Sequence, residues 1–395
     1  MKNKTIVILL ILLTAGSGLT MNVAGAATLG GVDIHGFISQ GFLYSNEYNY
    51  LAHNSKDGSF EYNEIGVNFS KQLTDKLRAG LQLFSRDVGD AANNKITLDW
   101  AYGDYRFQDW LGIRAGRIKL PLGLYNETRD MDMLRTSIVL PQGIYNDLTR
   151  DTLIAVNGAG LYGDVDLKIA GSLNYQFIAG SLNIDNDSGV GKAFDNGFAS
   201  SGLRVNGDMD SDTSYIGALR WETPIDGLKL GYTYFHAPAD TPVLVGGVME
   251  ATLSNTFQFH VGSVEYTWNN LVLSAEYMQR KTDSEVLGTD STAKAESYYL
   301  MASYALYDWM TLGAYYSVYY PHKDDKDGDD LAIDHNAWEK DLALTLRFDI
   351  NDYMVFKIEG HAVDGTANVL AADNTGNDFD ESDWYYGAAK VTFSF

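Results

Sequence analysis

Residues 385–395, YYGAAKVTFSF, alternate with a period of two and end on an aromatic residue. The apolar or small parity carries Tyr385, Gly387, Ala389, Val391, Phe393 and Phe395, and the polar parity carries Lys390, Thr392 and Ser394. Successive side chains of a strand point to opposite faces. The segment therefore predicts a β-strand with one face in hydrocarbon and the other in water.

The other end of the chain carries an export signal. Lys2 and Lys4 precede an apolar run, residues 6–13, and small residues follow at 24–26. These are the three parts of a secretory signal peptide, and the run is shorter than the roughly 20 residues that a membrane-spanning helix needs. We expect residues 1–26 to be removed on export. The absence of Cys excludes a lipoprotein anchor, disulfides and thiolate metal sites.

An exported chain that ends in this way resembles the bacterial outer-membrane β-barrels, whose final aromatic residue is read during insertion. The resemblance implies a location in the bacterial outer membrane, among lipid and lipopolysaccharide. It also implies recognition of Phe395 by the barrel-assembly machinery.

The composition agrees with a strand-rich membrane protein. The net charge becomes about −25 once Lys2 and Lys4 are removed, which excludes general nucleic-acid binding. The chain contains 26 tyrosines, 17 phenylalanines and 7 tryptophans but only 6 prolines, a composition that favours strands. Aromatic residues gather at the two interfaces of membrane barrels.

Period-two segments and the turns between them predict sixteen strands in a single domain over residues 27–395. The expected spans are 32–45, 59–72, 76–87, 95–107, 110–118, 150–162, 164–184, 211–223, 226–237, 253–268, 270–282, 294–306, 309–320, 337–350, 353–364 and 383–395.

The predicted connections alternate in length. Seven are tight, at residues 73–75, 108–110, 163–164, 224–227, 268–270, 307–309 and 351–353, and eight are long and polar. An even number of strands with short turns at one end and long loops at the other is typical of single-chain bacterial barrels. A soluble sandwich would also alternate, but it would leave edges, and these segments show no polar edge devices. We therefore predict an all-β fold, a 16-stranded antiparallel transmembrane β-barrel with short periplasmic turns and long extracellular loops.

The third long connection, residues 120–149, is rich in apolar residues that a loop in water has no reason to carry. They include Leu124, Met131, Met133, Leu134, Ile138, Val139 and Leu140. In general porins the third loop folds into the barrel and narrows the channel, and the strand count and this segment resemble that family. The resemblance implies an inward-folded constriction loop over residues 119–150. The alternative is a loop packed over the barrel mouth or against a neighbouring subunit.

The segment before that loop, residues 112–123 (GIRAGRIKLPLG), resembles the corresponding segment of the phosphate-selective porins of O and P type. The match covers about a dozen residues. It implies that Arg114, Arg117 and Lys119 lie near the constriction, but it does not extend to phosphate as the solute.

The loop region has a positive net charge although the whole chain is negative, since residues 111–150 hold six basic and four acidic side chains. Basic candidates on the polar parity of the strands include Arg220, Lys357 and Lys390. Basic wall residues facing acidic loop residues would set a transverse field across a narrow passage. The alternative is that these charges only pair with one another. The candidates for constriction and selectivity are Arg78, Arg114, Arg117, Lys119, Glu127, Arg129, Asp130, Asp132 and Arg135.

These features predict a porin, a water-filled channel for passive diffusion of ions and small hydrophilic solutes. Family resemblance implies a homotrimer. The alternatives are a solute-specific channel, such as one for anions or phosphate, and a barrel that sheathes a periplasmic cytochrome. We expect no enzymatic activity, because no Ser-centred glycine elbow or nucleotide-binding loop is present. We expect no cofactor or metal, because the acidic loop 322–335 fails the EF-hand pattern at Lys323, where the first carboxylate belongs.

Overall fold

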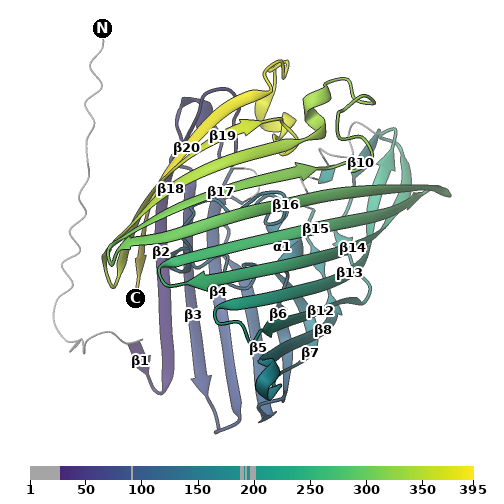
Figure 1. Ribbon diagram of the computed structural model, residues 1–395. Coiled ribbons are helices and arrows are strands. Elements are labelled where there is room, and N and C mark those ends of the chain that lie inside the picture. The colour runs from purple at the N-terminus through teal and green to yellow at the C-terminus, as the bar shows by residue number, and fades with distance from the viewer. Residues whose placement is uncertain (1–26, 90–91, 187–190, 192–193, 196–201) are drawn as a thin grey trace.

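Strands wrap around a single axis in the computed structural model, which describes residues 27–89, 92–186, 191, 194–195 and 202–395 (Figure 1). Residues 1–26, where we expect the signal peptide, lie outside this part. The first half of the wall consists of β2 (Val32–Ser45), β3 (Tyr62–Gln72), β4 (Leu77–Val88), β5 (Thr97–Gln108), β6 (Leu111–Lys119), β7 (Ala155–Asp166), β8 (Ser172–Ser181) and β12 (Ser214–Glu222). The second half consists of β13 (Leu228–Val245), β14 (Met249–Trp268), β15 (Leu271–Val286), β16 (Thr289–Tyr307), β17 (Met310–Tyr320), β18 (Glu339–Asn351), β19 (Met354–Asp364) and β20 (Asp383–Ser394).

Each of these strands pairs antiparallel with its neighbours, and β2 pairs with β20 to close the cylinder. The 16-stranded barrel predicted from the sequence is confirmed. The short strands β1 (Ala27–Leu29), β9 (Asn183–Ile184), β10 (Leu203–Val205) and β11 (Met209–Asp210) add to its rim. Among the described residues, no helix has the length and apolar character to cross a membrane.

The last residue takes part in this closure. Phe395 and Gly36 exchange backbone hydrogen bonds of 2.9 and 3.0 Å, and the Phe395 ring lies over Gly36 so closely that a Cβ there would overlap it. Position 36 therefore needs glycine for close approach, and the terminal ring covers the gap that the missing side chain leaves.

Replacing Gly36 with valine should force the Phe395 ring away and weaken the seam by about 1–3 kcal/mol, the usual cost of overpacking. The heat-modifiable mobility of the barrel in SDS gels should then change at a lower temperature. Gly103→Val is the matched control, since a Cβ at Gly103 in β5 meets open space. Equal melting temperatures for the two variants would contradict the role of the ring.

The two faces of the wall differ as the alternation predicts. In β18, Leu342 and Leu344 are exposed on the outer face, whereas Asp341 and Ala343 are buried on the inner face. Exposed aromatic side chains also mark both ends of the outer face. Tyr44, Tyr277, Tyr298, Tyr316 and Tyr385 lie toward the loop end, and Trp110, Trp268, Tyr307, Trp309 and Tyr353 lie at the short-turn end. Two aromatic belts around an apolar band are the pattern of a barrel that spans a membrane.

Three connections differ from the sequence prediction. The predicted turn at residues 163–164 is wrong, because β7 continues to Asp166 and the chain reverses at residues 167–171. The predicted long loops at 238–252 and 283–293 are also wrong. There β13 to β16 extend as strands and reverse at residues 246–248 and 287–288. These long hairpins project beyond the rest of the loop end (Figure 1).

Candidate pore constriction

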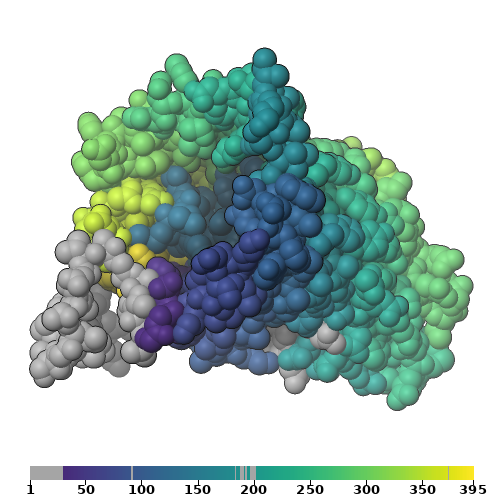
Figure 2. Space-filling model, turned by 90° about the horizontal axis from the view of Figure 1, so that it is seen from below, coloured from purple at the N-terminus to yellow at the C-terminus, as the bar shows by residue number. Residues whose placement is uncertain are grey.

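The connection between β6 and β7, residues 120–154, is called the inner loop here. It contains the 3-10 turn η2 (Asp132–Leu134) and the short helix α1 (Arg150–Leu153). Its backbone binds inward-facing carboxylates: Leu124 N donates to Glu276 of β15 at 2.9 Å, and Ile138 N donates to Glu359 of β19 at 2.8 Å. The inner loop therefore crosses the interior of the barrel. Figure 2 shows a hollow on the face seen from below, between the strands of the wall.

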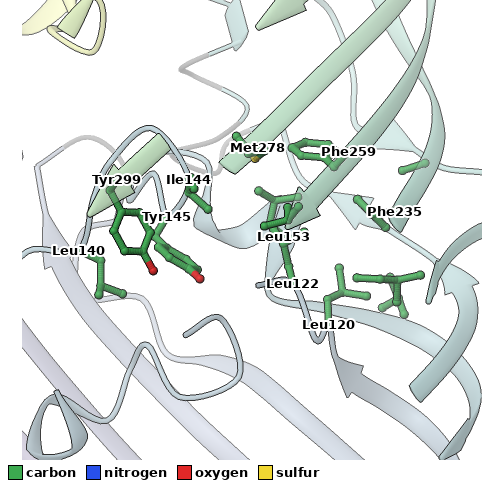
Figure 3. Close-up of a cluster of buried hydrophobic side chains, with 14 of the residues drawn as sticks. Leu120, Leu122, Leu140, Ile144, Tyr145, Leu153, Phe235, Phe259, Met278 and Tyr299 are labelled. Carbon is green, nitrogen blue, oxygen red and sulfur yellow. The ribbon is translucent and has the colours of Figure 1, made fainter. Parts of the chain in front are cut away.

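Apolar packing fastens one part of the inner loop to the wall. Leu120, Leu122, Leu140, Ile144 and Tyr145 are buried against the inward side chains of β13 to β16, among them Phe235, Phe259, Met278 and Tyr299 (Figure 3). Burying such side chains contributes about 1.5–3 kcal/mol each. This packing explains the apolar content that the sequence shows in this loop.

Glu276 joins the loop to β14, β15 and β16. Its carboxylate accepts hydrogen bonds from the hydroxyls of Tyr145, Tyr299 and Ser263, at 2.8 Å for Tyr299 and 2.5 Å for Ser263. Figure 3 shows the rings of Tyr145 and Tyr299 beside each other with their hydroxyl groups directed the same way. With Leu124 N as a further donor, one buried acceptor holds two parts of the inner loop.

Asp132 is the second attachment, on β19 and β20. Its carboxylate lies 3.0 Å from Lys357 Nζ and 3.5 Å from Lys390 Nζ, and it accepts a hydrogen bond of 2.8 Å from Thr392. Burial alone would raise the pKa of Asp132, but Lys357, Lys390 and Arg135 outweigh it and hold the pKa well below its usual range. Both lysine side chains are fully buried, so they depend on their carboxylate partners.

Asp130 forms the third attachment, on β5 and β6. Arg150 lies 2.6 Å and Lys119 2.8 Å from its carboxylate, and both cations also contact Asp99, at 2.7 and 3.2 Å. Burial would raise the pKa of Asp130, but Arg150 and Lys119 lower it well below its usual range. Nearby, Asp147 accepts a hydrogen bond of 2.9 Å from Arg129.

A second set of charges is only partly buried. Arg114 of β6 lies 2.9 Å from Asp104 of β5, and Glu127 of the inner loop lies 2.9 Å from Arg220 of β12. Gln176 of β8 joins the two pairs, contacting Arg114 at 3.3 Å and Glu127 at 3.4 Å. The side chains of Arg114, Glu127 and Arg220 are 23, 25 and 34% exposed. These five residues are called the constriction network.

The residues predicted from the sequence fall into three groups. Arg114 and Glu127 belong to the constriction network. Lys119, Arg129, Asp130, Asp132 and Arg135 hold the inner loop in largely buried ion pairs and hydrogen bonds. Arg78 lies exposed on β4 next to Asp104 in the ladder, with no ion pair to any described residue.

Arg117 lies on the other face of the wall. It pairs with Ala101 and Asn157 in the ladder, on the parity of Ile113 and Leu161, which are 38 and 44% exposed on the outer face. Its Nε donates to the backbone carbonyl of Asp99 at 3.1 Å. Arg114, three residues earlier, points to the interior.

The site prediction did not include Asp104, Gln176 and Arg220. Arg220 stands on the polar parity of its strand, so alternation marks it as an inward residue. Its pairing with Glu127 follows from the path of the inner loop, and this path has no periodic signal.

Comparison with known proteins identifies the fold. No family model matches the chain. An uncharacterized protein of Aquifex aeolicus (strain VF5) is 29% identical over 104 residues, which is 26% of this chain and only 23% of that protein.

Solved porin structures match nearly the whole chain. The anion-selective porin of Comamonas acidovorans has a TM-score of 0.57 at 17% identity, covering 92% of this chain and 99% of the porin. OmpF of Salmonella typhi, in complex with daunomycin, has a TM-score of 0.57 at 14% identity, and the match covers 92% of this chain and 97% of OmpF. OmpT of Vibrio cholerae in its trimer form has a TM-score of 0.56 at 12% identity, and the match covers 92% of this chain and 99% of OmpT. The chain therefore has the fold of the bacterial outer-membrane porins. The resemblance of residues 112–123 to phosphate-selective porins stays a prediction.

Proposed function

We propose that this protein is an outer-membrane porin through which ions and small hydrophilic solutes diffuse passively. The observation that carries the proposal is a closed barrel with two aromatic belts, whose interior holds a fastened loop and a partly exposed set of charges. Such a wall is polar inside and apolar outside, as a water-filled membrane channel requires. The test is single-channel conductance of the purified protein in planar bilayers, and stepwise current increments in KCl are the expected result.

The interior favours a channel over a sheath for a cytochrome. The inner loop contacts inward residues of β4, β13, β15, β17, β18, β19 and β20, so it occupies the space that a folded partner would need. We further propose a homotrimer, supported by the trimer form of Vibrio OmpT. Chemical crosslinking in outer membranes tests this assembly.

A modest preference for anions is the second candidate. On the short-turn side of the inner loop, Arg114, Arg220 and Arg347 are paired with Asp104, Glu127 and Asp349, and Lys229 is paired with Glu265. Because Arg78 has no ion pair among the described residues, its charge is available to attract anions.

Replacing Arg114 with alanine should shift the reversal potential in a KCl gradient toward that of a cation-selective channel. The change removes one positive charge and leaves the Asp104 carboxylate without its guanidinium partner. Arg117→Ala is the matched control, since it removes the same charge from the outer face of the same strand. Its reversal potential should equal that of the unmodified protein. Equal shifts in both variants would contradict the placement of the constriction network in the permeation path.

A further inference from the structure

The inner loop exposes an apolar side chain to the interior of the barrel. Leu134, at the end of η2, is 64% exposed, and Met131 and Met133 beside it are partly exposed. A leucine on the outer face would meet lipid. Leu134 instead lies between residues that bind inward-facing wall side chains, Asp132 to Lys357 and Thr392 and Arg135 to Arg347, so its exposed surface meets the water of the lumen.

The residues around Leu134 hold it in this position. Two residues before it, Asp132 is bound by Lys357 and Thr392. Directly after it, the carbonyl of Arg135 accepts a hydrogen bond of 2.8 Å from Arg347 of β18. Leu134 therefore cannot withdraw from water by a free movement of the loop.

A charged pair lies beside this apolar tip. Arg347, which contacts the residue next to Leu134, lies 2.6 Å from Asp349, and the two side chains are 16 and 32% exposed. A solute that passes here meets an apolar surface and a charged surface together. Exposed apolar area is stabilised when it contacts an apolar part of a ligand.

We propose that the passage beside Leu134 favours amphipathic organic ions, solutes that carry an alkyl or aryl group next to one charged head. The alkyl group contacts Leu134, Met131 and Met133, and the head contacts Arg347 or Asp349 according to its sign. This inference rests on the proposed channel function and names the solute class of the same passage.

The test measures block of the KCl current in planar bilayers by two homologous series. The probes are sodium alkanesulfonates from methanesulfonate to pentanesulfonate, and alkyltrimethylammonium chlorides of the same chain lengths. In at least one series the dissociation constant of block should fall by up to about fourfold per added methylene, the effect of burying one CH₂ group. Leu134→Asn, which keeps the side-chain size nearly constant, should reduce the change in the dissociation constant to less than about twofold per added methylene. Leu134→Met should retain it.

Leu331→Asn is the matched control, because Leu331 is an exposed leucine in the extracellular loop between β17 and β18. The dissociation constants of block for this variant should depend on chain length as they do for the unmodified protein. Block that is independent of chain length in both series, with normal KCl conductance, would overturn the inference and leave the channel function intact. Full chain-length dependence in Leu134→Asn would overturn it as well. Absence of KCl current would instead contradict the proposed function.

Discussion

Replacing Asp132 with alanine is expected to loosen the η2 part of the inner loop on β19 and β20 and to lower the free energy of unfolding by about 3–5 kcal/mol. The carboxylate is the only acidic partner of Lys357 among the described residues, at 3.0 Å, and it also lies near Lys390. Removing it leaves a fully buried ammonium group without a counter-charge, which costs more than the ion pair itself contributes. Guanidinium-induced unfolding in lipid vesicles measures the loss of stability.

The same variant should change conduction. Without the Asp132 carboxylate, η2 loses the hydrogen bond from Thr392 and the ion pair with Lys357, and keeps only the bond that Lys357 donates to the backbone carbonyl of residue 132. The inner loop should then narrow the passage less. We expect a larger single-channel conductance with increased current noise. Asp324→Ala, which removes an exposed carboxylate from the loop between β17 and β18, should leave both measurements unchanged. A double variant, Asp132→Leu with Lys357→Met, should recover much of the stability, since apolar replacement of a buried ion pair is often neutral. An unaltered unfolding transition in Asp132→Ala would contradict the attachment.

Much of the barrel could be predicted because lipid and water act on alternate residues of each strand. Where the outer face meets lipid, as at Leu342 and Leu344 of β18, alternation marks the strand within one or two residues. Beyond the membrane both faces meet water, so this signal ends although the strand continues. The tip of β15 and β16, with Asp283, Ser284 and Glu285, reads as a loop for that reason.

Two prolines also caused the end of β13 to be predicted as a loop. Pro238 and Pro242 argue against a strand, because proline cannot donate to the ladder. Both lie in the projecting part of β13, which pairs with β14 on one side and only with the short β10 and β11 on the other. Few ladder hydrogen bonds are lost there, so the strand persists.

The sequence predicted which segment forms the candidate site, but it did not predict which of the charged residues there pair with one another. Apolar residues in the third loop indicated that it packs against something, and Leu140 and Ile144 do so. Which charges pair depends on where a non-periodic loop crosses the lumen. Arg117 shows the limit most clearly, since its place on the outer face follows from its ladder partners rather than from its proximity to Arg114.

Acid should loosen the inner loop, with the change confined to the range below about pH 4. Burial would raise the pKa values of Asp130, Asp132 and Asp147, but their cationic neighbours, Arg150, Lys357 and Arg129 foremost, hold them below the usual range. In a detached loop these carboxyls would take up protons with a pKa of about 3.9. Attachment is therefore fully favoured above that pH. Below it, attachment weakens by about 1.4 kcal/mol per pH unit for each carboxyl until the lowered pKa is reached.

Single-channel conductance, corrected for the conductivity of the solution, measures this release. It should be constant from pH 8 to pH 5 and rise with increasing noise between pH 4 and pH 3. Asp132→Asn removes one of the three carboxyls, so its conductance should already be higher at pH 8 and should rise less steeply below pH 4. A transition near pH 6 or 7 would contradict the assignment.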